Sequence, residues 1–280
     1  MSQAKKDLSK EEVEEKVLGM LQEAKRIPRY KLSRERNALI DAIQYGHTQI
    51  AHSLLAHGVD PNSTDTKGRS ALWYAAYWTK NSLIRDLVER GAKLPDDVLM
   101  GPTHHGDTET VRLLVQRGAN VNCVASYTRY DLKFPQKVVL LSAAIQSARS
   151  KKSHAQIMDL PDEDWEVLPI TLINAGAEVN RLAFTYSIYE GFTRTLLGLA
   201  AHCGQVKTVK VMLGAGADVN QLDTWGGNAL FDVAYEGHLE VAKILIAAGI
   251  KRDVKWRDGA TASSIAREKG FIELADLISS

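Results

Sequence analysis

A helix-closing glycine recurs along the chain at near-regular intervals, and it limits what the chain can fold into. Successive copies are 33, 27, 58, 40 and 33 residues apart, and most are followed by a tail such as ADVN at 217–220. Self-similarity at a period of 20 to 50 residues predicts stacked repeats, because no single repeat can bury its own apolar face. The recurring glycines are Gly58, Gly91, Gly118, Gly176, Gly216 and Gly249.

Each repeat contains two short helices. In residues 223–250, apolar residues recur at helical spacing in two runs separated by Gly237 and His238. Helices of two to three turns are not stable alone in water, so each repeat needs its neighbours. In five of the repeats the first helix begins after a capping side chain, at Asn37, Ser70, Thr195, Asn228 and Thr261. Its start recurs as NALIDAI, SALWYAA, DVLMGPT, VVLLSAA, TLLGLAA, NALFDVA and TASSIAR.

Seven copies of this pattern, with a commonest gap of 33 residues, resemble the ankyrin repeat, whose signature is T-P-L-H-x-A. The resemblance covers residues 37–278. It implies an all-α repeat solenoid, in which helix-turn-helix repeats are joined by short β-turn or hairpin fingers. The chain departs from the family because no repeat keeps the signature histidine. The residues in its place are Ile40, Trp73, Met100, Leu141, Gly198, Phe231 and Ser264.

The predicted organisation is an N-terminal segment, 1–36, followed by one repeat domain, 37–280. Ser9 to Glu12 fit a capping box, and the apolar face that follows predicts a helix that caps the first repeat. The alternative is a detachable amphipathic segment that binds a partner. The predicted repeats span 37–62, 65–94, 97–122, 123–180, 181–220, 223–250 and 256–280.

Three departures from the standard repeat are visible in the sequence. The gap of 27 residues after Gly91 predicts a short link through Leu94, Pro95 and Asp96, with no projecting hairpin. Residues 123–137 and 181–194 are lengthened turns. An insertion at 145–164 is basic at first and acidic at its end, and its first half can prolong the inner helix.

The candidate binding residues are aromatic side chains in the turns and at the ends of the inner helices. In the ankyrin family these turns are fingers that line the concave face together with the inner helices. Exposed aromatics interleaved with arginine and lysine are typical of protein-binding surfaces. The candidates are Tyr77, Trp78, Tyr127, Arg129, Tyr130, Phe134, Phe184, Tyr186, Tyr189, Phe192, Trp225, Tyr235 and Trp256. The alternative is that finger aromatics pack on one another and only order the loops.

No pattern in the sequence indicates catalysis, a metal or a cofactor. His47 and His238 follow glycines at helix breaks, which favours a structural role, and His104-His105 lacks further ligands at metal-binding spacing. His202 and Cys203 are consecutive on a helix, so their side chains diverge, which disfavours a nucleophilic pair. The net charge of +1 gives no overall field for nucleic acid or an anionic membrane.

The sequence therefore predicts a non-enzymatic protein–protein interaction module of the adaptor, inhibitor or effector type. Alternatives are an atypical enzyme or regulatory half that uses the 145–164 insertion, and a nucleic-acid binder that uses Arg26–Arg36 or Arg149–Lys152. We expect a monomer that binds another protein and no membrane. Two cysteines and no visible signal or membrane-spanning segment predict a cytoplasmic, reducing location, although secretion by a signal-free route is compatible with the sequence.

Overall fold

The computed structural model describes Gly19 and residues 38–127, 136–158, 164–184, 193–256 and 258–280. Within these ranges the predicted architecture of paired helices with short hairpins is confirmed. The chain divides into two compact bodies. The N-terminal body comprises residues 1–102 and 116–119, and the C-terminal body comprises residues 103–115 and 120–280. The predicted capping helix in 1–36, Gly19 apart, lies outside the described residues, as does Asn37.

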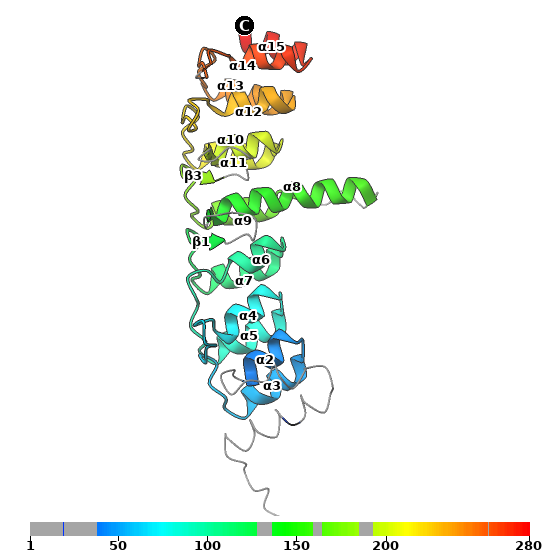
Figure 1. Ribbon diagram of the computed structural model, residues 1–280, viewed down its shortest axis with the longest axis vertical. Helices are drawn as coiled ribbons and strands as arrows, with labels where there is room; N and C mark the ends of the chain where they lie inside the picture. The colour runs from blue at the N-terminus through cyan, green and yellow to red at the C-terminus, as the bar shows by residue number, and fades with distance from the viewer. Residues whose placement is uncertain (1–18, 20–37, 128–135, 159–163, 185–192, 257) are drawn as a thin grey trace, which may run out of the picture. The chain divides into compact units, whose positions relative to one another are not determined.

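The N-terminal body contains two complete helix pairs. Inner helix α2 lies beside inner helix α4, and outer helix α3 lies beside outer helix α5 (Figure 1). The facing sides are filled by fully buried residues, among them Leu39, Leu54, Leu72 and Leu83. The pairs are α2 (Ala38–Gln44) with α3 (Thr48–Ala56), and α4 (Ala71–Tyr77) with α5 (Asn81–Glu89).

The third repeat has the shortest inner helix among the described residues. Residues 92–99 form turns and irregular backbone, which agrees with the short link expected there. The inner helix α6 (Met100–His104) starts two residues later than the register of the DVLMGPT copy predicts, and the outer helix is α7 (Thr108–Gln116). In the turn before α6, the Asp97 carboxylate accepts a hydrogen bond from the indole of Trp73 over 3.1 Å.

The C-terminal body stacks four further helix pairs. Inner helices α8, α10, α12 and α14 follow one another, and α12 packs against both α10 and α14 (Figure 1). Helix α8 projects past its neighbours, so the first half of the insertion does prolong the inner helix as expected. The pairs are α8 (Leu140–Met158) with α9 (Val167–Asn174), α10 (Leu196–His202) with α11 (Val206–Gly214), α12 (Ala229–Glu236) with α13 (Leu239–Ala247), and α14 (Ala262–Glu268) with α15 (Ile272–Ser279).

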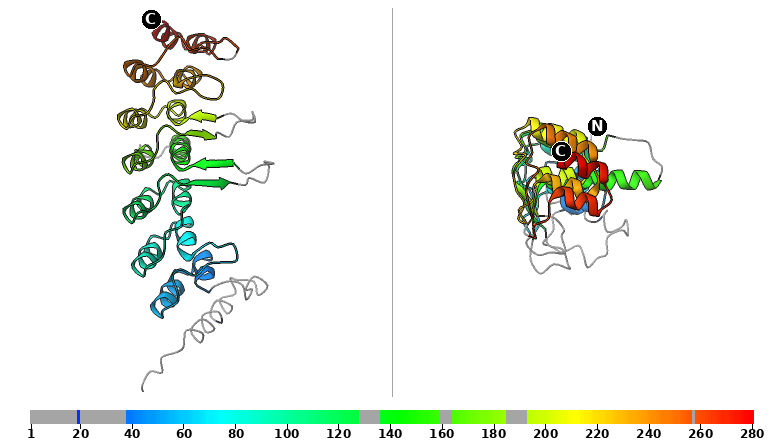
Figure 2. Two further views of the ribbon diagram at one scale, coloured as in Figure 1. Left: turned by 90° about the vertical axis from the view of Figure 1, so that its left-hand side faces the viewer. Right: turned by 90° about the horizontal axis from the view of Figure 1, so that it is seen from above.

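The two lengthened turns form antiparallel hairpins in the C-terminal body. The first finger pairs β1 (Val124–Tyr127) with β2 (Gln136–Val139), and Val124 faces Val139. The second finger pairs β3 (Leu182–Phe184) with β4 (Thr193–Thr195), and Leu182 faces Thr195. Both fingers point away from the outer helices, and β2 lies next to β3 (Figure 2).

The predicted helix caps are found at four of the five positions. Ser70, Thr195, Asn228 and Thr261 each accept a hydrogen bond from a backbone N–H in the first turn of the following inner helix. These bonds satisfy donors that have no partner within the helix. The start of each of these inner helices is therefore encoded locally.

Asparagines in the Val-Asn tails connect each repeat to the next. Asn180 donates its side-chain amide to the carbonyl of Gly216 over 3.0 Å, and its side-chain oxygen accepts from the backbone of Asp218 over 2.8 Å. Asn62, Asn122 and Asn220 make the same pair of contacts one repeat further along. The tails thus link neighbouring helix-closing turns.

We expect Asn180→Ala to lower the free energy of unfolding by about 1–2 kcal/mol, because it leaves the Gly216 carbonyl and the Asp218 amide without their side-chain partner. Urea unfolding followed by circular dichroism measures this change. Asn180→Asp is the matched control: it keeps the acceptor for Asp218 and loses the donor to Gly216, so it should cost less. An alanine variant as stable as the native chain would show that these bonds contribute nothing.

Candidate functional site

Helix α4 of the N-terminal body carries a stack of planar side chains. The Trp73 and Tyr77 rings lie 5.2 Å apart and 9° from parallel, and the guanidinium carbon of Arg69 lies 5.2 Å from the Trp73 ring centre. Tyr77 and Trp78 are 37% and 44% exposed, which is uncommon for such large rings. Trp78 meets Tyr77 edge to face. The stack therefore leads from the start of α4 to two exposed aromatics.

Asp65 holds the start of this stack. It forms an ion pair with Arg69 at 2.7 Å and accepts a hydrogen bond from the Tyr74 hydroxyl at 2.9 Å. Burial alone would raise the pKa of Asp65, but the hydrogen bonds from Arg69 and Tyr74 lower that pKa to about 2. The carboxylate is thus ionised at neutral pH, and it fixes the cation that stacks on Trp73.

The turn after these aromatics is strained. Thr79 has φ of 51°, and it is the one non-glycine residue with positive φ in the described part of the chain. Other repeats have a glycine at this place, for example Gly46, Gly204 and Gly237, all with positive φ. A β-branched residue in this region costs on the order of 1–2 kcal/mol, and such strain tends to occur at functional sites.

Tyr235 is the exposed aromatic of the C-terminal body. It lies near the end of α12 and is 51% exposed. The ammonium of Lys269 lies 4.1 Å from its ring centre, within range of a cation–π contact. Tyr77, Trp78 and Tyr235 thus all lie at the C-terminal ends of inner helices, as their sequence positions predict.

Trp225 and Trp256 pack against each other, which is the alternative the sequence analysis left open. Their ring centres are 5.7 Å apart, edge to face, and Trp256 also stacks on the buried Phe231 at 4.8 Å. A side chain at Gly227 would come within 2.1 Å of the Trp256 ring. Both tryptophans are half-buried, so they order the turns of the sixth and seventh repeats, and their contact with a partner stays a prediction.

The other candidate residues belong to the two fingers. Tyr127 ends β1 and Phe184 ends β3, and their backbones are described without their side chains. The remaining finger candidates lie outside the described residues and stay predictions. They are Arg129, Tyr130, Phe134, Tyr186, Tyr189 and Phe192.

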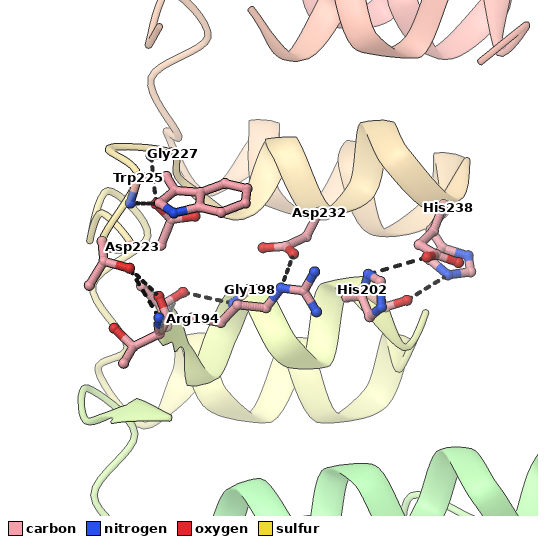
Figure 3. Close-up of polar contacts among 12 residues, drawn as sticks. Arg194, Gly198, His202, Asp223, Trp225, Gly227, Asp232 and His238 are labelled. Atoms are coloured by element: carbon pink, nitrogen blue, oxygen red, sulfur yellow. Dashed lines mark hydrogen bonds and ion pairs between the residues drawn. The ribbon is translucent and has the colours of Figure 1, made fainter. Parts of the chain in front are cut away.

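A buried ion pair between α12 and the second finger escaped the sequence analysis. Arg194, in β4, places its Nε 2.9 Å from an Oδ of Asp232 in α12, and the two side chains are 22% and 10% exposed (Figure 3). Gly198 provides the space, because a Cβ there would lie 2.5 Å from Asp232. The signal in the sequence is an aspartate inside NALFDVA, at a place where Leu199 and Ile265 of the neighbouring repeats are apolar. Asp41 of NALIDAI has the same register and is also buried.

Polar contacts continue from this pair along α10. The His202 Nδ1 lies 3.4 Å from the Glu236 carboxylate, and a ring nitrogen of His238 lies 3.1 Å from the His202 carbonyl (Figure 3). Burial and the nearby Arg194, Arg149 and His238 lower the pKa of His202 to about 3, so its imidazole is neutral. The contact with Glu236 is therefore not an ion pair at neutral pH.

The shifted pKa values of Cys203 and Asp232 do not favour nucleophilic chemistry at Cys203. Burial raises the pKa of the Cys203 thiol to about 11, whereas a nucleophilic cysteine needs a lowered pKa. Burial raises the pKa of Asp232 to about 7; Arg194 opposes this, and Asp223 and Glu236 add to it. Within the described ranges, no group of three or more His, Cys, Asp or Glu residues could hold a metal ion. Nor is any described helix long and apolar enough to cross a membrane.

The two shifted pKa values predict opposite effects of pH on stability. For Asp232 the folded pKa is raised from 3.8, so its contribution to stability is lost as pH rises from 3.8 to about 7. For His202 the folded pKa is lowered from 6.5, so its contribution is gained as pH rises from about 3 to 6.5. In the native chain the two slopes oppose each other over most of this range.

We expect single variants to separate these slopes. From about pH 4.5 to about pH 6.5, the unfolding free energy of Asp232→Asn should rise, by up to about 1.4 kcal/mol per pH unit. That of His202→Asn should fall over the same range. Urea unfolding at both pH values measures the slopes. Slopes of the same sign in the two variants would contradict the shifts.

The comparisons with known proteins settle the family. A family model described as ankyrin repeats (3 copies) matches residues 13–98, 39–125 and 171–280. The chain belongs to the ankyrin repeat family. The ankyrin domain of human ASB11, a solved structure, covers 88% of this chain with a TM-score of 0.61 at 19% identity, and the match includes 99% of that domain. This likeness supports the fold.

Two curated relatives extend the comparison. Ankyrin repeat protein nuc-2 of Neurospora crassa is 28% identical over 229 residues, or 76% of this chain, and the match spans only 21% of that protein. The putative ankyrin repeat protein YahD of Escherichia coli is 24% identical over 217 residues, which cover 74% of this chain and 94% of YahD. Ankyrin repeats in general are protein–protein interaction modules and typically non-enzymatic.

Proposed function

We propose that this chain is a non-enzymatic adaptor, inhibitor or effector that captures a partner protein on the side of its inner helices. The observation that carries the proposal is the exposure of Tyr77, Trp78 and Tyr235 at equivalent ends of inner helices. Large exposed aromatics supply much of the binding energy in protein interfaces. The N-terminal body offers the Tyr77–Trp78 pair, and the C-terminal body separately offers Tyr235.

Preorganisation supports these residues as anchors. Tyr77 is stacked on Trp73, and Tyr235 lies under Lys269, so each ring is held before a partner arrives. A side chain that is already ordered loses less conformational entropy on binding. The strained Thr79 beside Trp78 agrees with a binding role. Two cysteines without a disulfide support a reducing, cytoplasmic location as part of the proposal.

The test begins with in-cell crosslinking and mass spectrometry of the native chain, which identifies the partner. Calorimetry with the purified partner then compares Tyr77→Ser/Trp78→Ser with the native chain. We expect a loss of affinity of at least about tenfold, the size of a modest hot spot. The thermal midpoint should fall only modestly, because both side chains are partly exposed but Tyr77 loses its stacking contact with Trp73, so affinities are compared well below the midpoint of the variant.

Ile272→Ser is the matched control. Ile272 is a large apolar residue, 55% exposed, at the start of the outer helix α15, so its loss removes exposed apolar area away from the inner helices. Its affinity should equal that of the native chain. If the aromatic variant binds as tightly as the control, the partner does not use the Tyr77–Trp78 pair.

A further inference from the structure

We propose that the Arg194–Asp232 ion pair is a clamp that positions the second finger for partner binding, and that Gly198 admits this clamp. The inference rests on the proposed function, because the finger is one of its binding elements. Arg194 belongs to β4, the returning strand of the finger, whereas Asp232 belongs to α12 of the following repeat. The pair therefore connects a projecting hairpin to a rigid helix.

The clamp lies among buried neighbours. Thr193 and Thr195, on either side of Arg194, are 7% and 3% exposed. The Thr193 amide donates to the Thr224 hydroxyl over 3.0 Å, and the Thr224 amide donates to the Thr193 carbonyl over 3.3 Å. The base of the second finger is thus tied to the next turn by its backbone and to α12 by Arg194. An ion pair that is mostly removed from water is screened little by salt, so it can restrict the hairpin.

Gly198 is matched to the clamp. It occupies the place of the signature histidine in the first turn of α10. A Cβ at this position would lie 2.5 Å from an Oδ of Asp232, so only glycine leaves room for the carboxylate. The next repeat fills the same place with Phe231. In the fifth repeat, the space that a side chain at position 198 would fill is thus occupied by the buried Asp232 carboxylate of the sixth repeat. An apolar side chain would fill this space without burying a charge.

The other charges near Asp232 favour a position of the Arg194 guanidinium beside its carboxylate. Asp223, in the turn before α12, and Glu236, one helical turn along α12, are the other carboxylates that act on it, and Arg194 is the cation. Glu236 also lies 3.9 Å from Arg149 and beside His202. His238 lies against the His202 carbonyl at the far end of α10. Arg194 is therefore held by an excess of negative charge at the base of the second finger.

The first finger is an internal control. Val138 of β2 has the place that Arg194 has in β4, because each pairs with the second residue of the outgoing strand of its finger. The residue of α10 in register with Asp232 of α12 is Leu199. The first finger thus has two apolar residues at the places that the clamp occupies in the second. A perturbation that acts through the clamp should change the second finger and leave the first unchanged.

Hydrogen–deuterium exchange on the full chain tests the clamp without a partner, and it is done at about pH 8 because the Asp232 carboxylate, whose pKa is about 7, is then mostly ionised. In Asp232→Asn, a nearly isosteric change, amides of residues 182–195 should exchange at least about tenfold faster, as expected when a buried charged contact is lost. Amides of residues 124–139 should be unchanged. Unchanged exchange in the second finger, or equal acceleration in both fingers, would overturn the clamp.

If Asp232→Asn unfolds, a second set of variants tests the clamp by amide exchange. Gly198→Ala in the native chain should accelerate exchange of the second finger, because its Cβ displaces Asp232. In an Arg194→Met background, which removes the ion pair but keeps Asp232, the same substitution should have little further effect. Additive effects of the two substitutions would show that Gly198 does not act through the Arg194–Asp232 pair.

Affinity for the purified partner tests whether the clamp serves binding. Asp232→Asn should lower affinity by about tenfold, because the finger must then be ordered on binding. Replacement of residues 185–192 by a two-residue turn tests the finger itself. If that replacement leaves affinity unchanged, the finger's part in the proposed function fails. If it lowers affinity but Asp232→Asn does not, the clamp has no role in binding.

Discussion

Phe231→Ala should lower the unfolding free energy of the chain by about 3–5 kcal/mol, the range for removal of a large buried aromatic side chain. Phe231 is 2% exposed, and Trp256 of the next repeat stacks on it at 4.8 Å and 15° from parallel. Its removal leaves a cavity between two repeats and takes away the support for Trp256. Stability in a repeat stack depends on contacts between neighbours, so the loss should extend to both repeats.

Urea unfolding followed by circular dichroism measures the loss, and amide exchange locates it. Tyr235→Ala is the control within the same helix, one turn further on, where the side chain is 51% exposed. It should cost about 1 kcal/mol or less, mainly the contact with Lys269. Comparable losses in the two variants would mean that Phe231 does not support the interface between the sixth and seventh repeats.

The helical architecture could be predicted from the sequence because its determinants are local. A capping side chain such as Ser70 or Thr261 lies next to the helix that it starts, and a closing glycine such as Gly249 lies at the end of another. Helical spacing likewise placed Tyr77 and Tyr235 on exposed ends of inner helices. Contacts between residues a few positions apart leave a pattern that can be read directly.

The rest depends on contacts between repeats, which leave no such pattern. Arg194 and Asp232 are far apart in the sequence, so nothing in the pattern pairs them. Gly198 looks like a mere loss of the signature histidine, and only the structure shows that the Asp232 carboxylate fills the space beside it. In the same way, Trp225 and Trp256 read as two independent exposed aromatics, although they pack on each other. Finger residues such as Tyr186 lie outside the described residues and remain predictions.

Gly101→Ala should lower the unfolding free energy by about 2–3 kcal/mol, near the upper end for overpacking. Gly101 lies in α6, and an added Cβ would be 2.6 Å from the Tyr77 Cα and 3.2 Å from the Tyr77 backbone nitrogen. Backbone atoms cannot rotate away as a side chain can, so α4 and this turn of α6 would have to separate. The shift would also move the exposed Tyr77 ring, which the proposed function uses.

Gly214→Ala is the same substitution at a helical glycine with open space around it. Gly214 ends α11, and no atom of another part of the chain lies within 4 Å of the place that its Cβ would occupy. There alanine should be neutral or stabilising by up to about 1 kcal/mol, because it has the higher helix propensity. If glycine is required at position 101 because α4 and α6 approach each other closely, urea unfolding should show a loss of unfolding free energy in Gly101→Ala and no loss or a gain in Gly214→Ala. The same sign in both would show that α4 and α6 tolerate a side chain between them, and that the position of Tyr77 does not depend on this contact.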